Sequence, residues 1–293
     1  MGGRLHPFAS VFAAGRVERG RAVAASAASS SSLDALIFDC DGVILESEHL
    51  HREAYNKAFE EFGLEIGGDK VVWTEEFYDI LQNTVGGGKP KMRWYFGKYG
   101  WPSQKGGVAA PGETDAQESL VDALQDFKTQ AYKDLVANVA KPRPGVLRLM
   151  EEARSAGIYV AVCSAATKTS VEFTLNNLLG EEQFSALDCF LAGDDVSNKK
   201  PDPEIYITAS KKLDVHPDKC IVVEDSTIGL NAALGAGMDC IITYTGSTAT
   251  EAFEGAKMVV SDLGESPAKV TLDDLIACKA AEKMKDDRVV STE

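Results

Sequence analysis

Short apolar runs and amphipathic segments alternate along the C-terminal half of the chain. Runs that lack polar interruptions are typical of strands covered on both faces, and they lie at residues 158–163, 189–191, 220–223 and 240–243. Segments whose apolar residues recur at helical spacing lie between and around these runs, at residues 145–156, 167–179, 204–213, 228–236 and 272–285. This alternation predicts an α/β fold, a doubly wound parallel sheet with helices on both faces.

A different pattern occupies residues 45–141, where helical spacing dominates and no strong strand pattern occurs. The clearest helix covers residues 46–62, and Gly63 is a typical helix stop. Further helical patterns lie at residues 77–81, 91–99 and 120–135, with a Gly/Pro/Ser-rich loop at residues 101–114. We therefore expect this segment to be mainly helical.

Two acids follow the first apolar run of the chain. Residues 35–38 have the pattern of a buried strand, and Asp39 and Asp41 come after it with one residue between them. Gly42 allows the chain to turn sharply and brings the backbone close to a bound ligand. Open α/β sheets bind ligands at the carboxyl ends of their strands, so the pair is a candidate site. An acidic turn without function fits the same pattern.

Two later strands also end in polar residues. Ser164 follows one predicted strand, and Glu224 and Asp225 follow another. Lys200 stands just before a Pro-Asp-Pro helix start. The order of these groups along the chain is an acid pair, a hydroxyl, a lysine and a second acid pair. Together they indicate a catalytic site much more strongly than any one of them alone.

Four motifs resemble those of the haloacid dehalogenase-like (HAD) phosphatases. They are Asp39-Cys40-Asp41-Gly42-Val43, Cys163-Ser164, Lys200-Pro201-Asp202-Pro203 and Val223-Glu224-Asp225-Ser226. The resemblance covers roughly residues 34–264. It implies a Rossmann-like HAD core formed by residues 33–44 and 142–293, with residues 45–141 inserted as an α-helical cap domain.

The resemblance also implies a mechanism. Asp39 would be the nucleophile that forms an aspartyl-phosphate, which splits one difficult hydrolysis into two steps. Asp41 would protonate the leaving sugar oxygen and then deprotonate the attacking water. Ser164 and Lys200 would bind phosphoryl oxygens.

The charges in such a site require a cation. Three carboxylates and a phosphate dianion total about −5, and like charges about 4 Å apart repel by roughly 4 kcal/mol at an effective dielectric constant near 20. An oxygen-rich ligand set suits Mg²⁺. The ligands implied are the Asp39 carboxylate, the Asp41 backbone carbonyl, Asp225, and Glu224 directly or through water.

Other members of the superfamily provide alternative interpretations. Asp41 argues against haloacid dehalogenases, and P-type ATPases carry threonine at that position together with membrane spans. β-Phosphoglucomutases share the first motif and the cap type, and His51 falls where they carry a histidine in the cap linker. A mutase therefore remains open, as does a non-enzymatic, regulatory relative that binds a phosphorylated ligand.

The cap segment carries a narrower resemblance. Residues 46–52 and 86–93 are similar to those of CbbY-type phosphatases of photosynthetic organisms, which act on xylulose 1,5-bisphosphate. This similarity implies that Glu48 contacts substrate hydroxyls and that the glycine-rich turn at residues 86–89 holds the distal phosphate, although an ordinary connecting turn has the same composition. The implied substrate-binding residues are Asp39, Glu48, His51, Gly86, Gly87, Gly88, Lys89, Arg93, Ser164, Ala165, Ala166 and Lys200.

Composition narrows the possible partners. A formal net charge of −15 argues against nucleic acid, because a basic surface is needed to replace phosphate counterions. No apolar run approaches the roughly 20 residues that span a bilayer. The six cysteines form no C-x-x-C pair and predict reduced, mostly buried thiols. We expect a small phosphorylated sugar as the partner and a monomeric protein.

The first 32 residues differ from the remainder of the chain. They contain Arg4, Arg16, Arg19 and Arg21 but a single acid, Glu18, and end in a run of alanine and serine. This composition is typical of organellar transit peptides. We therefore interpret residues 1–32 as a leader and expect the mature protein in the chloroplast stroma.

Overall fold

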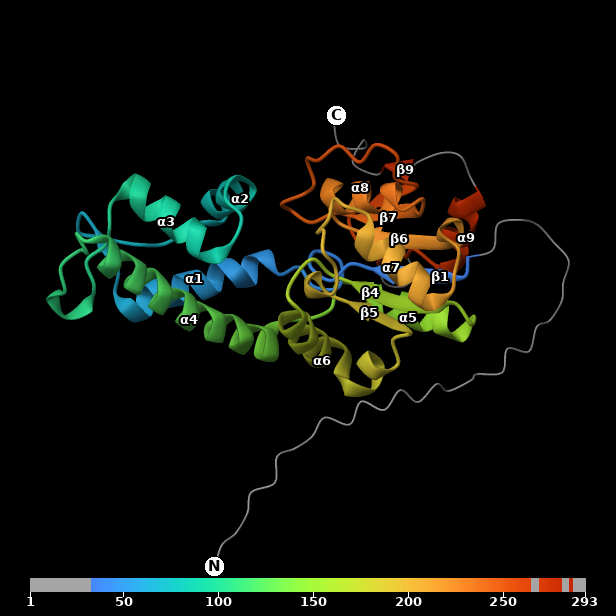
Figure 1. Ribbon diagram of the computed structural model, residues 1–293, viewed down its shortest axis with the longest axis horizontal. Coiled ribbons are helices and arrows are strands. Elements are labelled where there is room, and N and C mark those ends of the chain that lie inside the picture. The colour runs from blue at the N-terminus through green and yellow to red at the C-terminus, as the bar shows by residue number, and fades with distance from the viewer. Residues whose placement is uncertain (1–32, 265–268, 281–284, 287–293) are drawn as a thin grey trace, which may run out of the picture. The chain divides into compact units, whose positions relative to one another are not determined.

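A parallel sheet forms the centre of the α/β part of the protein. The computed structural model describes residues 33–264, 269–280 and 285–286, so the expected leader at residues 1–32 lies outside the described residues. The strand order is β5-β4-β1-β6-β7-β8-β9, and every neighbouring pair is parallel (Figure 1). The strands are β1 (Ala35–Phe38), β4 (Tyr159–Cys163), β5 (Cys189–Leu191), β6 (Cys220–Glu224), β7 (Asp239–Thr243), β8 (Met258–Val260) and β9 (Lys285–Asp286).

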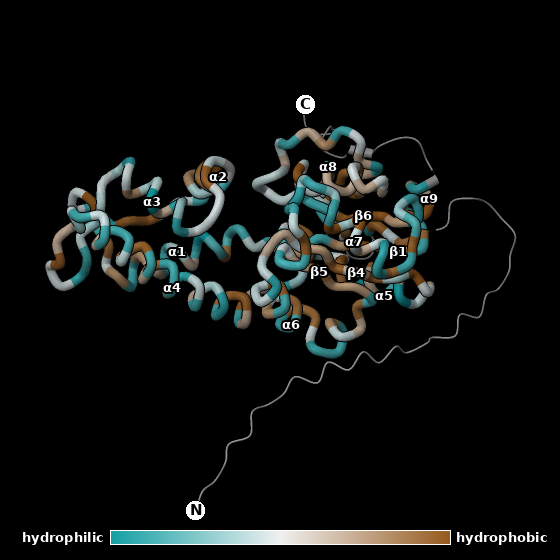
Figure 2. The backbone as a smooth tube through the Cα atoms, in the orientation of Figure 1, coloured by the Kyte–Doolittle hydropathy of each residue, from teal (hydrophilic) through white to brown (hydrophobic). Residues whose placement is uncertain are grey.

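Helices cover both faces of this sheet, as the apolar pattern predicts. Along β1, Leu36 and Phe38 pack into one cluster of buried residues, and Ala35 and Ile37 pack into another. The first cluster includes helices α5 (Val146–Ser155), α6 (Lys168–Ser185) and α9 (Leu272–Ala280), and the second includes α7 (Glu204–Leu213) and α8 (Thr227–Gly235). Strands β1 and β4, at the centre of the sheet, are accordingly hydrophobic along most of their length (Figure 2).

Residues 45–141, which we call the helical insertion, connect β1 to α5 and β4. They form α1 (Glu48–Phe62), the two-residue strands β2 (Glu65–Ile66) and β3 (Asp69–Lys70), α2 (Glu75–Thr84), α3 (Gly88–Tyr99) and α4 (Thr114–Val139). Helices α1 and α4 pack side by side. Away from the sheet, an aromatic cluster that includes Phe59, Trp73 and Phe96 fills the space between the helices.

Both α1 and α4 contribute to two hydrophobic clusters. Leu50 on α1 and Leu135 on α4 belong to the same cluster as the sheet residues, whereas Phe59 and Leu124 belong to the aromatic cluster of the helical insertion. The first residues of α1 and the last residues of α4 are therefore anchored to the α/β part of the protein, next to the end of β1.

The structure departs from the predicted elements in a few places. Helix α3 begins at Gly88, so Gly88 and Lys89 lie in a helix and not in the expected turn. Helix α6 continues to Ser185 through a break at Gly180, where φ is 79° and ψ is 159°. Of the helix expected at residues 272–285, Leu272–Ala280 are helical, residues 281–284 lie outside the described residues, and Lys285 belongs to a strand. Strands β8 and β9 were not predicted.

Two expectations about the whole chain can be compared with the described residues. All six cysteines are free and buried, as predicted. Among the helices of the described ranges, none combines the length and the apolar content that a membrane span needs.

Candidate active site

Three neighbouring strands position the predicted core residues. Strand β1 lies between β4 and β6, and the last residues of these strands stand at the same edge of the sheet. Asp39 follows β1 and still donates its backbone N–H to Val223 on β6 (2.9 Å). Ser164 follows β4 and donates its backbone N–H to Leu191 on β5 (3.0 Å). Parallel pairing thus brings residues more than a hundred positions apart to one place.

These residues line one cavity of about 330 Å³. The lining residues are Asp39, Asp41, Ser164, Ala165, Lys199, Lys200, Glu224, Asp225, Ser226, Ile228 and Gly229. The four catalytic and the four metal-binding positions expected from the sequence are all among them. Ala166 lies next to this wall, where its backbone N–H donates to the Ser164 hydroxyl (3.1 Å).

Lys200 connects the acids of this cavity. Its ammonium group lies 2.5 Å from an oxygen of Asp39 and 2.7 Å from an oxygen of Glu224, and it also donates to the Cys163 carbonyl (3.0 Å). Burial alone lowers the pKa of Lys200, but the two carboxylates outweigh burial and raise that pKa above its usual value. The Tyr206 hydroxyl donates to the same Glu224 oxygen (2.5 Å). Lys200 is therefore a permanent buried cation.

Negative charge exceeds positive charge in this cluster. One oxygen from each of Asp39, Glu224 and Asp225 lies within 4.8 Å of the others. Burial and the neighbouring carboxylates raise the pKa of Asp39 and of Asp225, although Lys200 opposes the rise. The raised pKa of Asp39 favours a neutral acid, whereas the raised pKa of Lys200 favours an ion pair; the 2.5 Å contact supports the ion pair. A hard divalent cation would fit this oxygen set and offset its excess charge.

The turn after β1 holds Asp41 against the cavity. The Ser47 hydroxyl donates to the Asp41 carboxylate (2.8 Å), and burial raises the pKa of this carboxyl group. Gly42 has a φ of 86°, and a Cβ atom at this position would overlap the Asp225 side chain. The turn therefore requires glycine for two reasons, its backbone conformation and its closeness to an acid of the site.

The helical insertion contributes a half-buried carboxyl group, that of Glu48, close to this turn. Burial raises the pKa of Glu48 to about 7, opposed mainly by Lys91. His51 stacks on the Tyr132 ring at 4.1 Å, and its Nδ1 atom lies 2.9 Å from the Lys128 ammonium. Burial, and then Lys128 and Lys91, lower the pKa of His51 well below its usual value. His51 is therefore neutral at pH 7.

The predicted distal-phosphate residues lie at the start of α3. Gly86 and Gly87 precede the helix, and Gly88 begins it so close to the end of the Gln125 side chain that a Cβ atom there would require Gln125 to move. The two predicted cations of this helix pair with acids of α4: Lys89 lies 2.7 Å from Asp122, and Arg93 forms a double hydrogen bond with Glu118. Both pairs are partly exposed to solvent.

Comparisons with known proteins identify the family. Residues 33–237 match the haloacid dehalogenase-like hydrolase family. The chain belongs to the haloacid dehalogenase-like hydrolases. It is 56% identical over 242 residues to a haloacid dehalogenase-like hydrolase domain-containing protein of Arabidopsis thaliana, with 81% of this chain and 77% of the relative covered. It is 41% identical over 253 residues to the CBBY-like protein of the same plant, with 84% and 76% covered.

A solved structure supports the same assignment. A crystal structure of a mutant CbbY from Rhodobacter sphaeroides in complex with xylulose-(1,5)bisphosphate has a TM-score of 0.63 and 31% sequence identity, and the match covers 83% of this chain and 99% of that one. The chain is accordingly a HAD-like phosphatase of the CbbY type, as the sequence motifs predicted.

Sequence analysis of this HAD hydrolase missed Lys128 and Tyr206. Lys128 lies on the buried side of α4, with its ammonium 4.9 Å from the centre of the Tyr55 ring and 5.1 Å from that of Tyr132. It interrupts an apolar stripe four positions after Leu124, and a lysine in such a stripe is a detectable signal. Tyr206 has the pattern of an ordinary core residue, and only its contact with Glu224 reveals a polar role.

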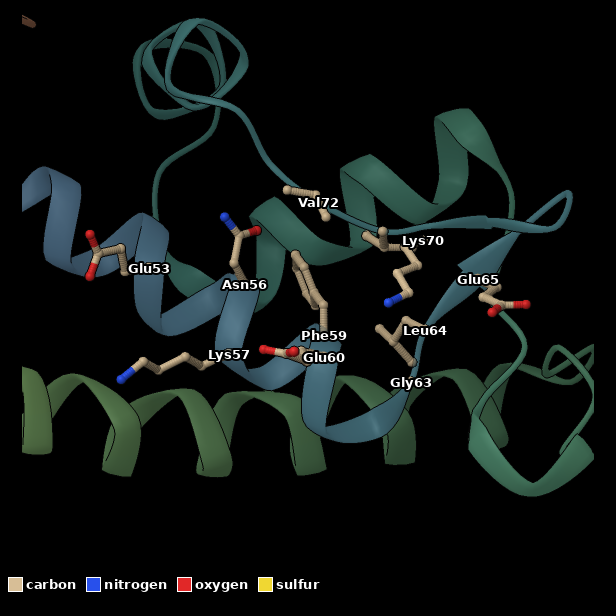
Figure 3. Close-up of a pocket in the computed structure, with 11 residues that line it drawn as sticks. Glu53, Asn56, Lys57, Phe59, Glu60, Gly63, Leu64, Glu65, Lys70 and Val72 are labelled. Carbon is tan, nitrogen blue, oxygen red and sulfur yellow. The ribbon is translucent and has the colours of Figure 1, made fainter.

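A larger groove of about 490 Å³ lies elsewhere in the helical insertion (Figure 3). Its lining combines apolar residues such as Phe59 and Leu64 with acids and lysines such as Glu53 and Lys57. None of the predicted site residues lines it. Side chains of both signs give this groove no clear preference for an anion, so we place the chemistry at the sheet edge.

Substitution of Gly42 tests the close contact with Asp225. Gly42→Ala should lower the free energy of unfolding by more than the roughly 1–2 kcal/mol that a left-handed conformation costs. Phosphate release should fall roughly 10- to 100-fold, because Asp225 must move. Gly67→Ala is the matched control, since its φ is 64° and a Cβ atom there meets nothing within 4 Å. Equal losses in the two variants, by urea denaturation and by phosphate release, would contradict this prediction.

The buried Lys128 should make stability depend on pH. Burial, and then Lys91, lower its pKa from 10.5 to about 8. Between these values the unfolded chain binds more protons at this site, so the free energy of unfolding rises with pH. Wild-type protein should therefore gain about 3 kcal/mol of stability from this lysine between about pH 7 and about pH 10.5. Lys128→Met should lack this gain, so its stability relative to wild type should fall by the same amount. Lys57→Met, at an exposed position, measures in the same denaturation series the effect of removing a lysine elsewhere. A stability difference between Lys128→Met and wild type that does not change with pH would refute the argument.

Proposed function

We propose that this HAD hydrolase is a Mg²⁺-dependent sugar-bisphosphate phosphatase whose substrate is xylulose 1,5-bisphosphate and whose intermediate is an aspartyl-phosphate on Asp39. One observation carries the catalytic part of the proposal: Lys200 contacts the Asp39 carboxylate in a cavity that three further acids line. The substrate is suggested by the CbbY relative, whose structure is a complex with that sugar bisphosphate.

Asp39, Asp225 and the Asp41 backbone carbonyl would hold the Mg²⁺ ion. Glu224 would take part directly or through water, because one of its oxygens already accepts hydrogen bonds from Lys200 and Tyr206. Mg²⁺, when bound, supplies positive charge that stabilises the charge on the phosphoryl oxygens. The excess of carboxylates over cations in this cavity is the observation that supports the ion.

The chain's own residues then divide the chemistry between them. Asp39 attacks phosphorus with one carboxylate oxygen, and the bond from phosphorus to the sugar oxygen breaks. Asp41 gives its proton to that sugar oxygen and afterwards takes a proton from the water that attacks the acyl phosphate, which releases phosphate and restores both aspartates. Lys200, the Ser164 hydroxyl and the backbone N–H of Ala165 would bind phosphoryl oxygens. The Ala166 N–H donates to the Ser164 hydroxyl and would join them by exchanging that acceptor for a phosphoryl oxygen.

The helical insertion would select the substrate. We propose that residues 45–141 act as the cap domain on a core of residues 33–44 and 142–293. Glu48 and His51 would contact sugar oxygens, while Gly86–Gly88, Lys89 and Arg93 would hold the second phosphate. Lys91 and Lys128 are further buried or half-buried cations near Glu48. Two anion sites in one protein favour a substrate with a phosphate at each end.

The cellular setting follows from the leader and the relatives. Residues 1–32 have the composition of a transit peptide, and two of the three similar proteins named above come from a plant. We propose that the mature protein is a monomer that works in the chloroplast stroma.

Removal of the nucleophile or of the metal should stop turnover. Asp39→Asn should abolish phosphate release and leave Mg²⁺-dependent substrate binding measurable by calorimetry, since only the attacking oxygen is lost. EDTA should silence wild-type protein and Mg²⁺ should restore it, whereas Ca²⁺ should restore little because it prefers a higher coordination number. Asp218→Asn, at an exposed site, is the control. Residual turnover of Asp39→Asn near a tenth of wild type, or full activity in chelated buffer, would overturn this mechanism.

A substrate panel tests the second anion site. Xylulose 1,5-bisphosphate should be hydrolysed far faster than the corresponding monophosphates, because the distal phosphate holds the reacting one in line. Lys89→Ala should remove a charge-assisted contact worth about 1.5–3 kcal/mol, which reduces that preference roughly 10- to 150-fold. It should leave monophosphate hydrolysis nearly unchanged.

Lys98→Ala, at the other end of α3, is the matched control for this series. Retention of the bisphosphate preference in Lys89→Ala would remove Lys89 from the proposed site. Conversion of β-glucose 1-phosphate to glucose 6-phosphate faster than any bisphosphate is hydrolysed would replace the phosphatase proposal with a mutase.

A further inference from the structure

Arg143 forms a hydrogen-bonded clamp beside the turn that carries Asp41. It lies in the segment that leads from α4 to α5, between Pro142 and Pro144. Its Nη1 atom donates to the carbonyl of Gly42 and to that of Thr243 (2.8 Å). Its Nη2 atom donates to the carbonyls of Tyr244 (2.8 Å) and Ser261 (2.6 Å).

These carbonyls come from three separate segments. Gly42 belongs to the turn after β1, Thr243 and Tyr244 stand at the end of β7, and Ser261 follows β8. The Arg143 backbone N–H also donates to the Ile44 carbonyl of the same turn (2.8 Å). One residue therefore ties both connections of the helical insertion to the carboxyl edge of the sheet.

Backbone hydrogen bonds stabilise the turn at residues 40–45. The N–H groups of Ile44 and Leu45 donate to the Cys40 carbonyl (2.9 and 3.2 Å), and that of Gly42 donates to the Leu45 carbonyl (2.7 Å). The Asp41 carboxylate receives the Ser47 hydroxyl on the chain that leaves the turn. Gly42 is the residue that follows Asp41, so the clamp acts on the backbone directly after Asp41.

We propose that Arg143 is a positioning residue for proton transfer: it holds the Gly42 carbonyl, and through it the Asp41 backbone, where the Asp41 carboxyl group can protonate the leaving oxygen. The inference rests on the proposed function in one respect, the acid role of Asp41. Loss of the clamp should leave Asp39, Lys200 and the phosphoryl-binding groups in place. Because the Asp41 carbonyl belongs to the proposed metal ligands, both substrates are assayed at saturating Mg²⁺, where a weaker affinity for the metal is compensated. Under that condition the step that needs the proton should be impaired.

Arg148 provides a matched comparison. It lies five residues further on, in α5, and its Nη2 atom also donates to backbone carbonyls, those of Leu263 (3.0 Å), Gly264 (3.1 Å) and Val270 (2.9 Å). None of these carbonyls adjoins a residue of the proposed active site. A purely structural effect of losing an arginine clamp can therefore be measured at Arg148.

The experiment separates a positioning role from loss of stability by varying the leaving group. The value of kcat/KM reports the steps through formation of the aspartyl-phosphate. A nitrophenolate leaves without protonation, whereas a sugar alkoxide does not. We therefore compare kcat/KM for p-nitrophenyl phosphate with kcat/KM for the sugar phosphate that the panel above shows to be hydrolysed fastest.

Arg143→Gln should lower kcat/KM for the sugar phosphate roughly 10- to 100-fold and for p-nitrophenyl phosphate less than about threefold. Arg143→Lys, which keeps the charge but not the forked geometry, should show the same selectivity to a smaller extent. Arg148→Gln should change kcat/KM for both substrates by the same factor. Should Arg143→Gln not fold, the Lys variant alone decides the question.

Asp41→Asn separates failure of this inference from failure of the proposed function. If Asp41→Asn is selective for the sugar phosphate and the Arg143 variants are not, the positioning role of Arg143 is wrong and the acid role of Asp41 stands. If Asp41→Asn lowers kcat/KM equally for both substrates, the acid role of Asp41 is wrong, and the inference fails with it. Selectivity in both positions supports the inference.

Discussion

The ion pairs of Lys200 are the interaction on which the rest of the site depends. Three carboxylates at adjacent strand ends would repel one another, and the buried ammonium offsets part of that repulsion. All three of its donors find acceptors, in Asp39, Glu224 and the Cys163 carbonyl. The position of the Asp39 carboxylate is consequently determined before any ligand arrives, as the proposed attack on phosphorus along one direction requires.

Close packing of backbone against acids is a second constraint. Gly42 and Gly229 both lack the atom that would collide with an acid of the site, Asp225 in one case and Glu224 in the other. The sheet aligns the acids to within a few ångströms, and the two glycines allow the neighbouring turn and helix to enclose them. Electrostatic attraction and steric fit therefore depend on the same few residues.

Periodicity predicted most of this fold, because strands buried on both faces and amphipathic helices leave distinct patterns. The residues that directly follow or end each apolar run could also be read from the sequence. Asp39, Ser164 and Glu224 lie together at the sheet edge because parallel strands end on the same side. Partners 161 residues apart, such as Lys200 and Asp39, were linked only through a family resemblance. Pattern alone could not reveal Tyr206, whose ring is apolar and whose hydroxyl is not, nor the pairing of Lys89 with Asp122, which depends on how two helices pack.

The aromatic cluster of the helical insertion has an evolutionary consequence. Residues such as Trp73 and Phe96 pack among themselves and share no member with the two clusters that flank the sheet. Changes of stability at distant, unconnected positions add with little coupling. Substitutions can therefore accumulate within this cluster during evolution with little effect on the stability of the sheet that ends in Asp39 and Ser164.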